Sequence, residues 1–150
     1  IAILAMTYDS QIGQLTLSGL AHNGVQVNVG FLGKETSSTK ISNDEWSLSI
    51  PGKLISGKQK ILAVLLGKNG ELLSKNSINI TGKAIQNANG NTFVIIQKGD
   101  ALWNIAFDRL GLGNLYVDIV KLNKDKIDNP DLIYPKQLFV IPAQTENNKN

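Results

Sequence analysis

The sequence predicts two domains, an all-β antiparallel sandwich followed by a small α+β domain with the order strand, helix, helix, strand. Two observations indicate this fold class. Apolar residues recur at every second position over residues 14–81 and at helical spacing after Asn91, so the hydrophobic period changes once. Polar turn formers with little that could be buried separate the two patterns. We therefore expect a first domain at residues 1–83, a linker at 84–91, a second domain at 92–143 and a disordered tail at 144–150.

The first domain is predicted from short alternating strands. Val25, Val27, Val29 and Phe31 alternate with small or polar residues, which on an extended strand places the apolar side chains on one face. Trp46 begins a similar strand and is expected in the core. Further strands are predicted at residues 15–17, 61–66 and 78–80, and turn formers lie at 22–24, 42–44 and 67–70. Several short strands with turns at such spacing are typical of an antiparallel sandwich.

Three segments of this half stand out: SGLA at residues 18–21, NDEWSL at 43–48, and the apolar strand that follows Gly57. In this order they resemble a bacterial immunoglobulin-like module. Glu45 stands where such modules usually have Gly, and there is no cysteine pair. The resemblance implies an immunoglobulin-like fold and a protein partner for this module.

The second domain follows from helical spacing and from helix-ending residues. Residues 93–97 are rich in strand formers, and Asp100 is expected to cap a helix whose inward face carries Leu102, Ile105 and Ala106. Glycines at 111 and 113 end that helix. A second helix is predicted from near residue 114, before the Asn-Pro pair at 129–130, and a last strand at 138–141.

Four segments of the second domain follow one another in order: QKGDALWNIA at residues 97–106, LN at 122–123, NPDLIYPKQ at 129–137 and VIP at 140–142. With these segments the second domain resembles LysM throughout its length. Several separated motifs in the correct order are more specific than one short pattern. The resemblance implies a non-catalytic module, without cofactor or metal, that binds N-acetylglucosamine-containing glycan. Peptidoglycan or a chitin-like polymer would be the partner, in a bacterial cell envelope, where the module would anchor a larger protein.

The resemblance also implies a shallow groove between two loops. An acetamido group has one hydrogen-bond donor, one acceptor and a methyl group, so backbone groups and apolar side chains suit it. The first wall of the groove would be Gly99, Asp100, Ala101 and Leu102, and the second would be Pro130, Asp131, Leu132, Ile133 and Tyr134.

Some of these residues have an alternative structural role. Asp100 could serve only as a helix cap, and Trp103 is expected in the core rather than stacked on sugar. Tyr134 could equally stack on a sugar ring or close the core. Leu132 and Ile133 are expected to divide the tasks, one facing inward and one facing the groove.

Two residues depart from the LysM pattern. Ala101 stands where most members have Thr or Ser, so a hydroxyl contact to glycan is absent; such a bond contributes about 1 kcal/mol, roughly a factor of five in affinity. Lys136 replaces the usual Gly of a Pro-Gly-Gln turn, which indicates either a turn without positive φ or local strain. Both departures indicate weak or altered glycan binding, and Ala101 keeps a second function open, a structural or protein-docking module with a LysM fold that no longer binds sugar strongly.

Composition limits the other functions. The charge of +3 comes from scattered lysines, and the six basic and six acidic residues of the second domain cancel, so no nucleic-acid surface is indicated. There is no cysteine, and we expect the single histidine, His22, at the surface. Asp125, Asp128 and Asp131 lack the Gly and Glu of a calcium loop. The first six residues are too short to span a membrane. Because the chain begins at Ile1, the parent protein is expected to be longer, and a cell-wall hydrolase with a catalytic domain outside this sequence is a third possibility.

Overall fold

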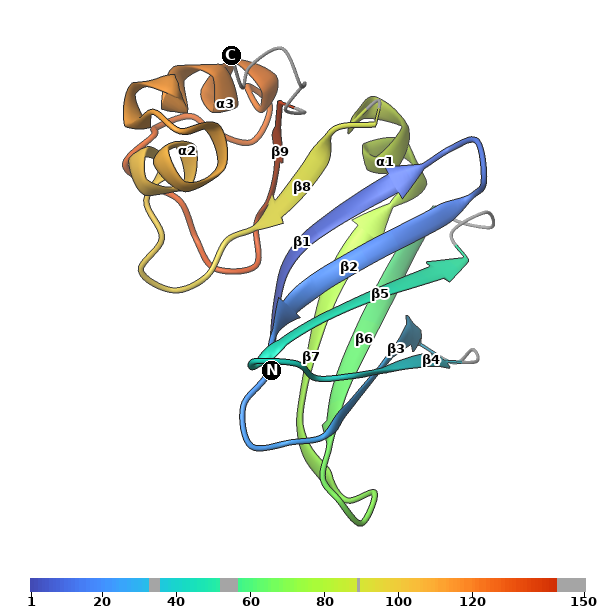
Figure 1. Cartoon of the computed structure of the whole chain (residues 1–150). Helices are drawn as coiled ribbons and strands as arrows, with labels where there is room; N and C mark the ends of the chain where they lie inside the picture. Colours follow the sequence, from blue (N-terminus) through green and yellow to red (C-terminus); the bar gives the residue numbers. More distant parts are fainter. Residues whose placement is uncertain (33–35, 52–56, 89, 143–150) are drawn as a thin grey trace. The chain divides into compact units, whose positions relative to one another are not determined.

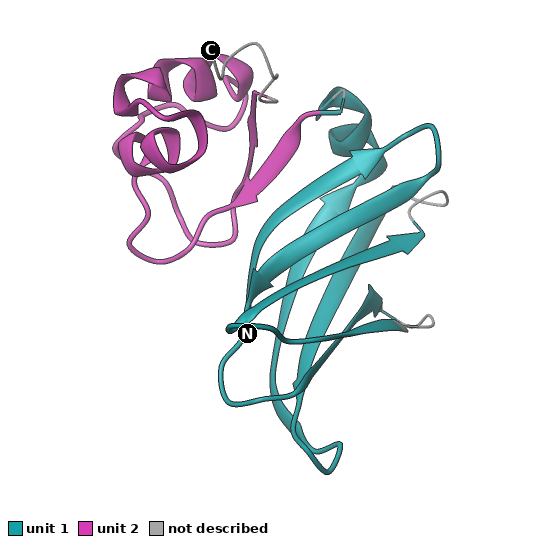
Figure 2. Cartoon of the chain, in the orientation of Figure 1, with its two compact units in different colours: residues 1–90 teal, residues 91–150 magenta. Residues whose placement is uncertain are grey.

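The computed structural model describes residues 1–32, 36–51, 57–88 and 90–142 (Figure 1). The predicted tail at 144–150 lies outside these residues. The chain divides into two compact units, unit 1 at residues 1–90 and unit 2 at residues 91–150 (Figure 2). Unit 1 is built almost wholly of strands, and unit 2 combines a strand pair with short helices.

Unit 1 contains two antiparallel groups of strands (Figure 1). The first has the order β5-β2-β1, and the second has the order β4-β3-β6-β7. The strands are β1 (Ala2–Asp9), β2 (Gln14–Leu20), β3 (Gln26–Phe31), β4 (Thr36–Lys40), β5 (Glu45–Pro51), β6 (Lys58–Leu66) and β7 (Leu72–Thr81). The prediction that this region is largely antiparallel β-sheet is confirmed.

Alternation along these strands builds the core of unit 1. Leu15 and Leu17 of β2 and Val27 and Val29 of β3 are fully buried, while intervening residues are more exposed. Trp46 is also buried, as predicted. The turn predicted at 42–44 is a two-residue hairpin loop, in which Ser42 and Glu45 exchange two backbone hydrogen bonds of 2.9 Å. The two residues between them have φ of 54° and 63°, as a type I′ turn requires.

A helix occupies most of the residues that were predicted as a linker at 84–91. Residues Gly82–Ala88 form helix α1, which packs against β7. The hydroxyl of Thr81 caps it by accepting a 3.0 Å hydrogen bond from the Ala84 N–H. Ile85 and Ala88 form the buried face of this helix. The polar residues around them, which suggested a linker, therefore form the outer face of a short amphipathic helix.

Unit 2 has the predicted order of strand, helix, helix and strand (Figure 1). Its elements are β8 (Thr92–Ile95), α2 (Leu102–Leu110), the 3-10 turn η1 (Gly113–Leu115), α3 (Tyr116–Leu122) and β9 (Leu138–Ile141). β8 and β9 are antiparallel, with Thr92 opposite Ile141 and Ile95 opposite Leu138. The helices bury one apolar face against this pair, with Leu102, Ile119 and Phe139 in a common core. Across the described residues no helix is long and apolar enough to cross a membrane.

Asn123 joins α3 to β9 from inside this core. It is 1% exposed. Its Nδ2 donates to the carbonyl oxygens of Ile119 and Val140, both at 2.7 Å, and its Oδ1 accepts from the Val140 N–H at 2.8 Å. The Ile119 carbonyl belongs to the last turn of a helix, where backbone acceptors need partners outside the helix. One amide side chain thus provides hydrogen-bond partners for the end of α3 and for the backbone of β9.

Candidate functional site

The two loops of the predicted site leave the strand pair at the same place. Beyond β8 and β9 the antiparallel ladder continues by two hydrogen bonds. The Ile96 N–H donates to the Gln137 carbonyl at 2.8 Å, and the Lys136 N–H donates to the Ile96 carbonyl at 2.7 Å. The first loop, residues 97–101, therefore starts beside the point where the second loop, residues 129–136, ends. Main-chain bonds thus hold together the bases of two loops that are distant in sequence.

The first loop is a tight turn at residues 97–100. The Asp100 N–H donates to the Gln97 carbonyl at 3.1 Å, and Gly99 has a φ of 89°, which a side chain at that position would strain. Oδ2 of Asp100 accepts from the Gln97 N–H at 2.8 Å. The predicted role of Asp100 as the helix cap is therefore wrong, because its carboxylate closes the preceding turn instead.

The N-cap position of α2 is occupied by Ala101. Its backbone is extended, with φ of −131° and ψ of 146°, and its carbonyl accepts the first helical bond from Ile105 at 3.0 Å. No side-chain hydrogen bond caps this helix end in the described structure. The N–H groups of the first helical turn have no acceptor within a helix. They can therefore donate hydrogen bonds to a ligand.

The second loop ends in a turn at residues 134–137. The Gln137 N–H donates to the Tyr134 carbonyl at 3.2 Å, Pro135 occupies the second position, and Lys136 in the third has a φ of 71°. This is the pattern of a type II turn, in which the third residue is usually Gly. Of the two alternatives for Lys136, the strained turn is the one observed. Oε1 of Gln137 accepts from the Tyr134 N–H at 2.7 Å, as Asp100 does in the first loop.

The start of the second loop is fixed by Asn129. Its Oδ1 accepts from the Asp131 N–H at 3.0 Å, and its carbonyl accepts from the Leu132 N–H at 2.9 Å. Such Asx turns hold the backbone without a neighbouring element. Pro130 and Asp131 are thereby placed at the tip of the loop.

The site residues divide into outward and inward side chains. Leu132 and Tyr134 are 57% and 58% exposed, whereas Ile133 packs against the core, so Ile133 is the inward residue of the pair and Leu132 is the outward one. Leu102, predicted in the first wall, is only 3% exposed. Leu102 can therefore meet a ligand only through its backbone.

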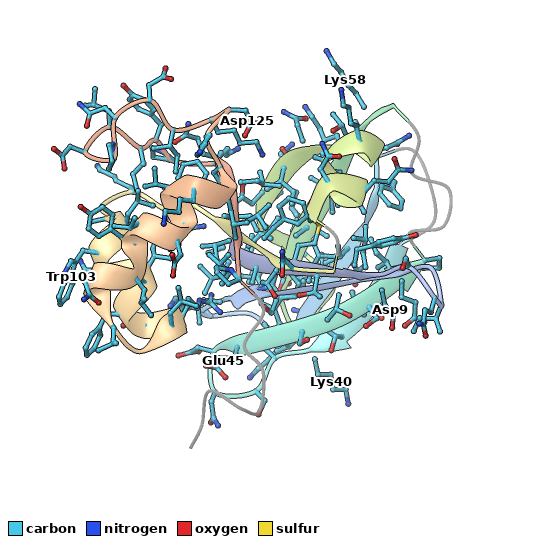
Figure 3. All side chains as sticks on the ribbon, turned by 90° about the horizontal axis from the view of Figure 1, so that it is seen from above. Asp9, Lys40, Glu45, Lys58, Trp103 and Asp125 are labelled. Carbon is cyan, nitrogen blue, oxygen red and sulfur yellow. The ribbon has the colours of Figure 1, made fainter. Side chains whose placement is uncertain are left out.

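Trp103 was predicted in the core, and this prediction is wrong. Its side chain is 53% exposed and stacks on Phe107, with ring centroids 5.6 Å apart and planes 4° apart. Figure 3 shows Trp103 at the outer edge of the helices of unit 2. Phe107 was not identified from sequence. Helical spacing could have identified the pair. Positions 103 and 107 lie one turn apart, and neither belongs to the inward face formed by Leu102, Ile105 and Ala106.

The described residues include no group of three or more His, Cys, Asp or Glu that could hold a metal ion. His22 lies in unit 1, where its Nδ1 is 3.2 Å from Oδ2 of Asp44 and both side chains are largely exposed.

Comparison with known proteins agrees with this geometry for part of the chain. Residues 94–142 match the LysM domain family, and this segment is a LysM domain. LysM domains are non-catalytic binding modules, associated with glycans such as peptidoglycan and typically with the cell envelope.

A curated relative is the potassium binding protein Kbp of Escherichia coli O6:H1 (strain CFT073). It is 29% identical to this chain over 105 residues, which are 70% of this chain and 68% of the relative. The matched length exceeds unit 2, so the similarity extends into unit 1. No solved structure matches the chain at a significant level.

Proposed function

We propose that the LysM domain binds N-acetylglucosamine-containing glycan, most simply bacterial peptidoglycan, between residues 99–102 and residues 130–134. The observation that carries this proposal is the pair of main-chain bonds around Ile96, which brings the two loops together at their bases. Each loop is closed by its own turn and by a side chain that accepts the first N–H of that turn. Such a site is formed before the ligand arrives, so binding requires little ordering of the protein.

The chemistry of the two loops suits an acetylated amino sugar. The first turn of α2 offers N–H donors for the acetamido carbonyl, since Ala101 provides no capping side chain. The exposed Leu132 and Tyr134 offer apolar surface for the methyl group and for one face of the sugar ring. Asp131, also exposed, can accept hydrogen bonds from sugar hydroxyls.

Binding by one such site is expected to be weak. Few sugar units are contacted, and a dissociation constant near 1 mM corresponds to about 4 kcal/mol. On a polymeric wall, several copies or further domains of a longer envelope protein would raise retention through effective concentration. The domain would then act as an anchor.

Amide-shift mapping during titration with the shortest N-acetylglucosamine oligomer that binds tests the proposal. With this oligomer, shifts confined to the two loops and the first turn of α2 are expected. Leu132→Ala should weaken binding several-fold, whereas Leu72→Ala, an equally exposed leucine in unit 1, should not. Shifts elsewhere would relocate the site, and failure of the chain to sediment with either peptidoglycan or chitin would refute it.

A protein-docking role is the second candidate, and Ala101 is the observation that favours it. The absence of a hydroxyl at this position removes a bond to glycan while leaving the fold intact. In unit 1 the pairing of β2 with β5 and of β3 with β6 supports an immunoglobulin-like sandwich, where strands B and E and strands C and F pair in the same way. Such a module would serve as a spacer or would bind a protein partner.

Potassium binding is a further candidate, favoured by the relative named for it and by a match that reaches beyond the LysM domain. Backbone carbonyl oxygens would be suitable ligands, since they replace the hydration shell of potassium in selective sites. Calorimetry with potassium chloride, with sodium chloride as the control, tests this. Equal heats for the two salts would refute it.

A further inference from the structure

Trp103 and Phe107 form an exposed pair on α2, here called the aromatic ledge. Both side chains are 53% exposed, and their rings are parallel within 4°. The inward face of the helix is formed by other residues, so packing of the LysM core does not require large rings at these two positions. Large aromatic side chains that remain half in water point to a binding surface.

The Trp103 ring is held in one place. It lies against Gly113 so closely that a Cβ on that glycine would be 1.9 Å from the ring carbon Cε2. Gly113 is buried, and Phe107 stacks on the same indole. A ring fixed by backbone and by a second ring loses little freedom when a ligand stacks on it.

The size of the aromatic ledge indicates the kind of partner. Fully exposed aromatic side chains offer about 150–250 Å² each, so two half-exposed rings offer roughly 200 Å². A stable protein interface needs about 800 Å² on each side. The two rings by themselves fall well short of that area, and their size suits a ligand the size of a sugar ring.

Polar side chains near the aromatic ledge suit a hydroxyl-rich ligand. Asn104 lies three positions before Phe107 on α2, the spacing at which helical side chains are neighbours, and Asn114 follows Gly113; both side chains are exposed. Amide groups donate and accept hydrogen bonds and can pair with hydroxyls at the edge of a sugar whose face lies on an aromatic ring. Trp103 is also only two residues beyond Ala101, at the end of the first loop.

We propose that the aromatic ledge is a stacking subsite for a further pyranose ring of the glycan whose acetamido group the two loops bind. The inference rests on the proposed function, and it adds that affinity rises with oligomer length until a sugar reaches Trp103.

Calorimetric titration with N-acetylglucosamine oligomers of increasing length tests the subsite. Trp103→Ala should weaken binding of long oligomers roughly three- to tenfold and leave the shortest binding oligomer unaffected. Trp103→Phe should retain part of the rise in affinity with oligomer length. Gly113→Ala, which displaces the ring without removing it, should resemble Trp103→Ala, and Leu72→Ala is the matched control.

Fluorescence provides an independent measurement. Trp46 is buried in unit 1, so the Trp46→Phe protein reports Trp103 alone. Its emission should shift to shorter wavelength with long oligomers and stay unchanged with the shortest.

The outcomes separate the two proposals. If Trp103→Ala binds every oligomer as the wild type does while Leu132→Ala is impaired, the subsite is refuted and the groove stands. If the wild-type chain binds no oligomer, both proposals fail. Self-association in sedimentation velocity that Trp103→Ala abolishes would assign the ledge to a second copy of the chain and overturn the subsite.

Discussion

Replacing Asn123 should destabilise unit 2 more than any other change of an uncharged polar residue to alanine in its described part. The side chain is 1% exposed and takes part in three hydrogen bonds of 2.7–2.8 Å. Each contributes about 1 kcal/mol, and the backbone groups of Ile119 and Val140 lose their partner when the amide is removed. We therefore expect Asn123→Ala to lower the free energy of unfolding of unit 2 by about 3 kcal/mol. Asn123→Leu, which fills the space without pairing the backbone groups, should be at least as harmful.

Native-state hydrogen exchange measures this loss within unit 2 alone. The slowest amides of β8 and β9 report unfolding of this unit, and a loss of about 3 kcal/mol accelerates their exchange roughly a hundredfold. The Val140 amide should change most, since its acceptor is Oδ1 of Asn123. Asn104→Ala, the same change at an exposed position of α2, should alter stability by less than about 0.5 kcal/mol. Acceleration of less than tenfold in Asn123→Ala would refute the reasoning.

Three further predictions concern single positions. Lys136→Gly should stabilise unit 2 by about 1 kcal/mol in chemical denaturation, because Lys136 has a φ of 71°; a loss of stability would show that its side chain matters more than the strain. Ala101→Ser should stabilise α2 by about 1 kcal/mol by capping it and, if the hydroxyl also reaches the sugar, should raise glycan affinity about fivefold; unchanged stability would show that the cap does not form. Gly19→Ala should destabilise unit 1 by about 1–3 kcal/mol, because the added Cβ would be 1.8 Å from the Ala2 carbonyl oxygen, and unaltered thermal unfolding would contradict this.

The strands that were predicted from the sequence are those in which apolar residues alternate with small or polar residues. β3 and β5 were found because each places apolar residues on one face only. β1 was missed because its apolar residues occupy nearly every position, and β4 because its sequence, TSSTK, has no apolar residue. β4 lies at the edge of its sheet, where pairing with β3 rather than burial of side chains makes the strand.

The site was predicted less completely than the fold. Motif spacing located both loops, but not the direction of the side chains within them. Asp100 was assigned to the wrong hydrogen bond because an acceptor before a helix can close a turn or cap the helix, and only the backbone path decides between them. Trp103 was assigned to the core on residue type alone, although helical spacing from Leu102 would have placed it outside.

The two backbone bonds of Ile96 set the spacing of the two loops at their bases without using any ligand-facing side chain. In the proposed glycan site, substitutions at Leu132 or Tyr134 would change the contacts with the ligand and leave the spacing of the loop bases unchanged. A fixed spacing would suit a polymer of identical repeating units, and its selectivity would then change without any change in the backbone that holds the loops.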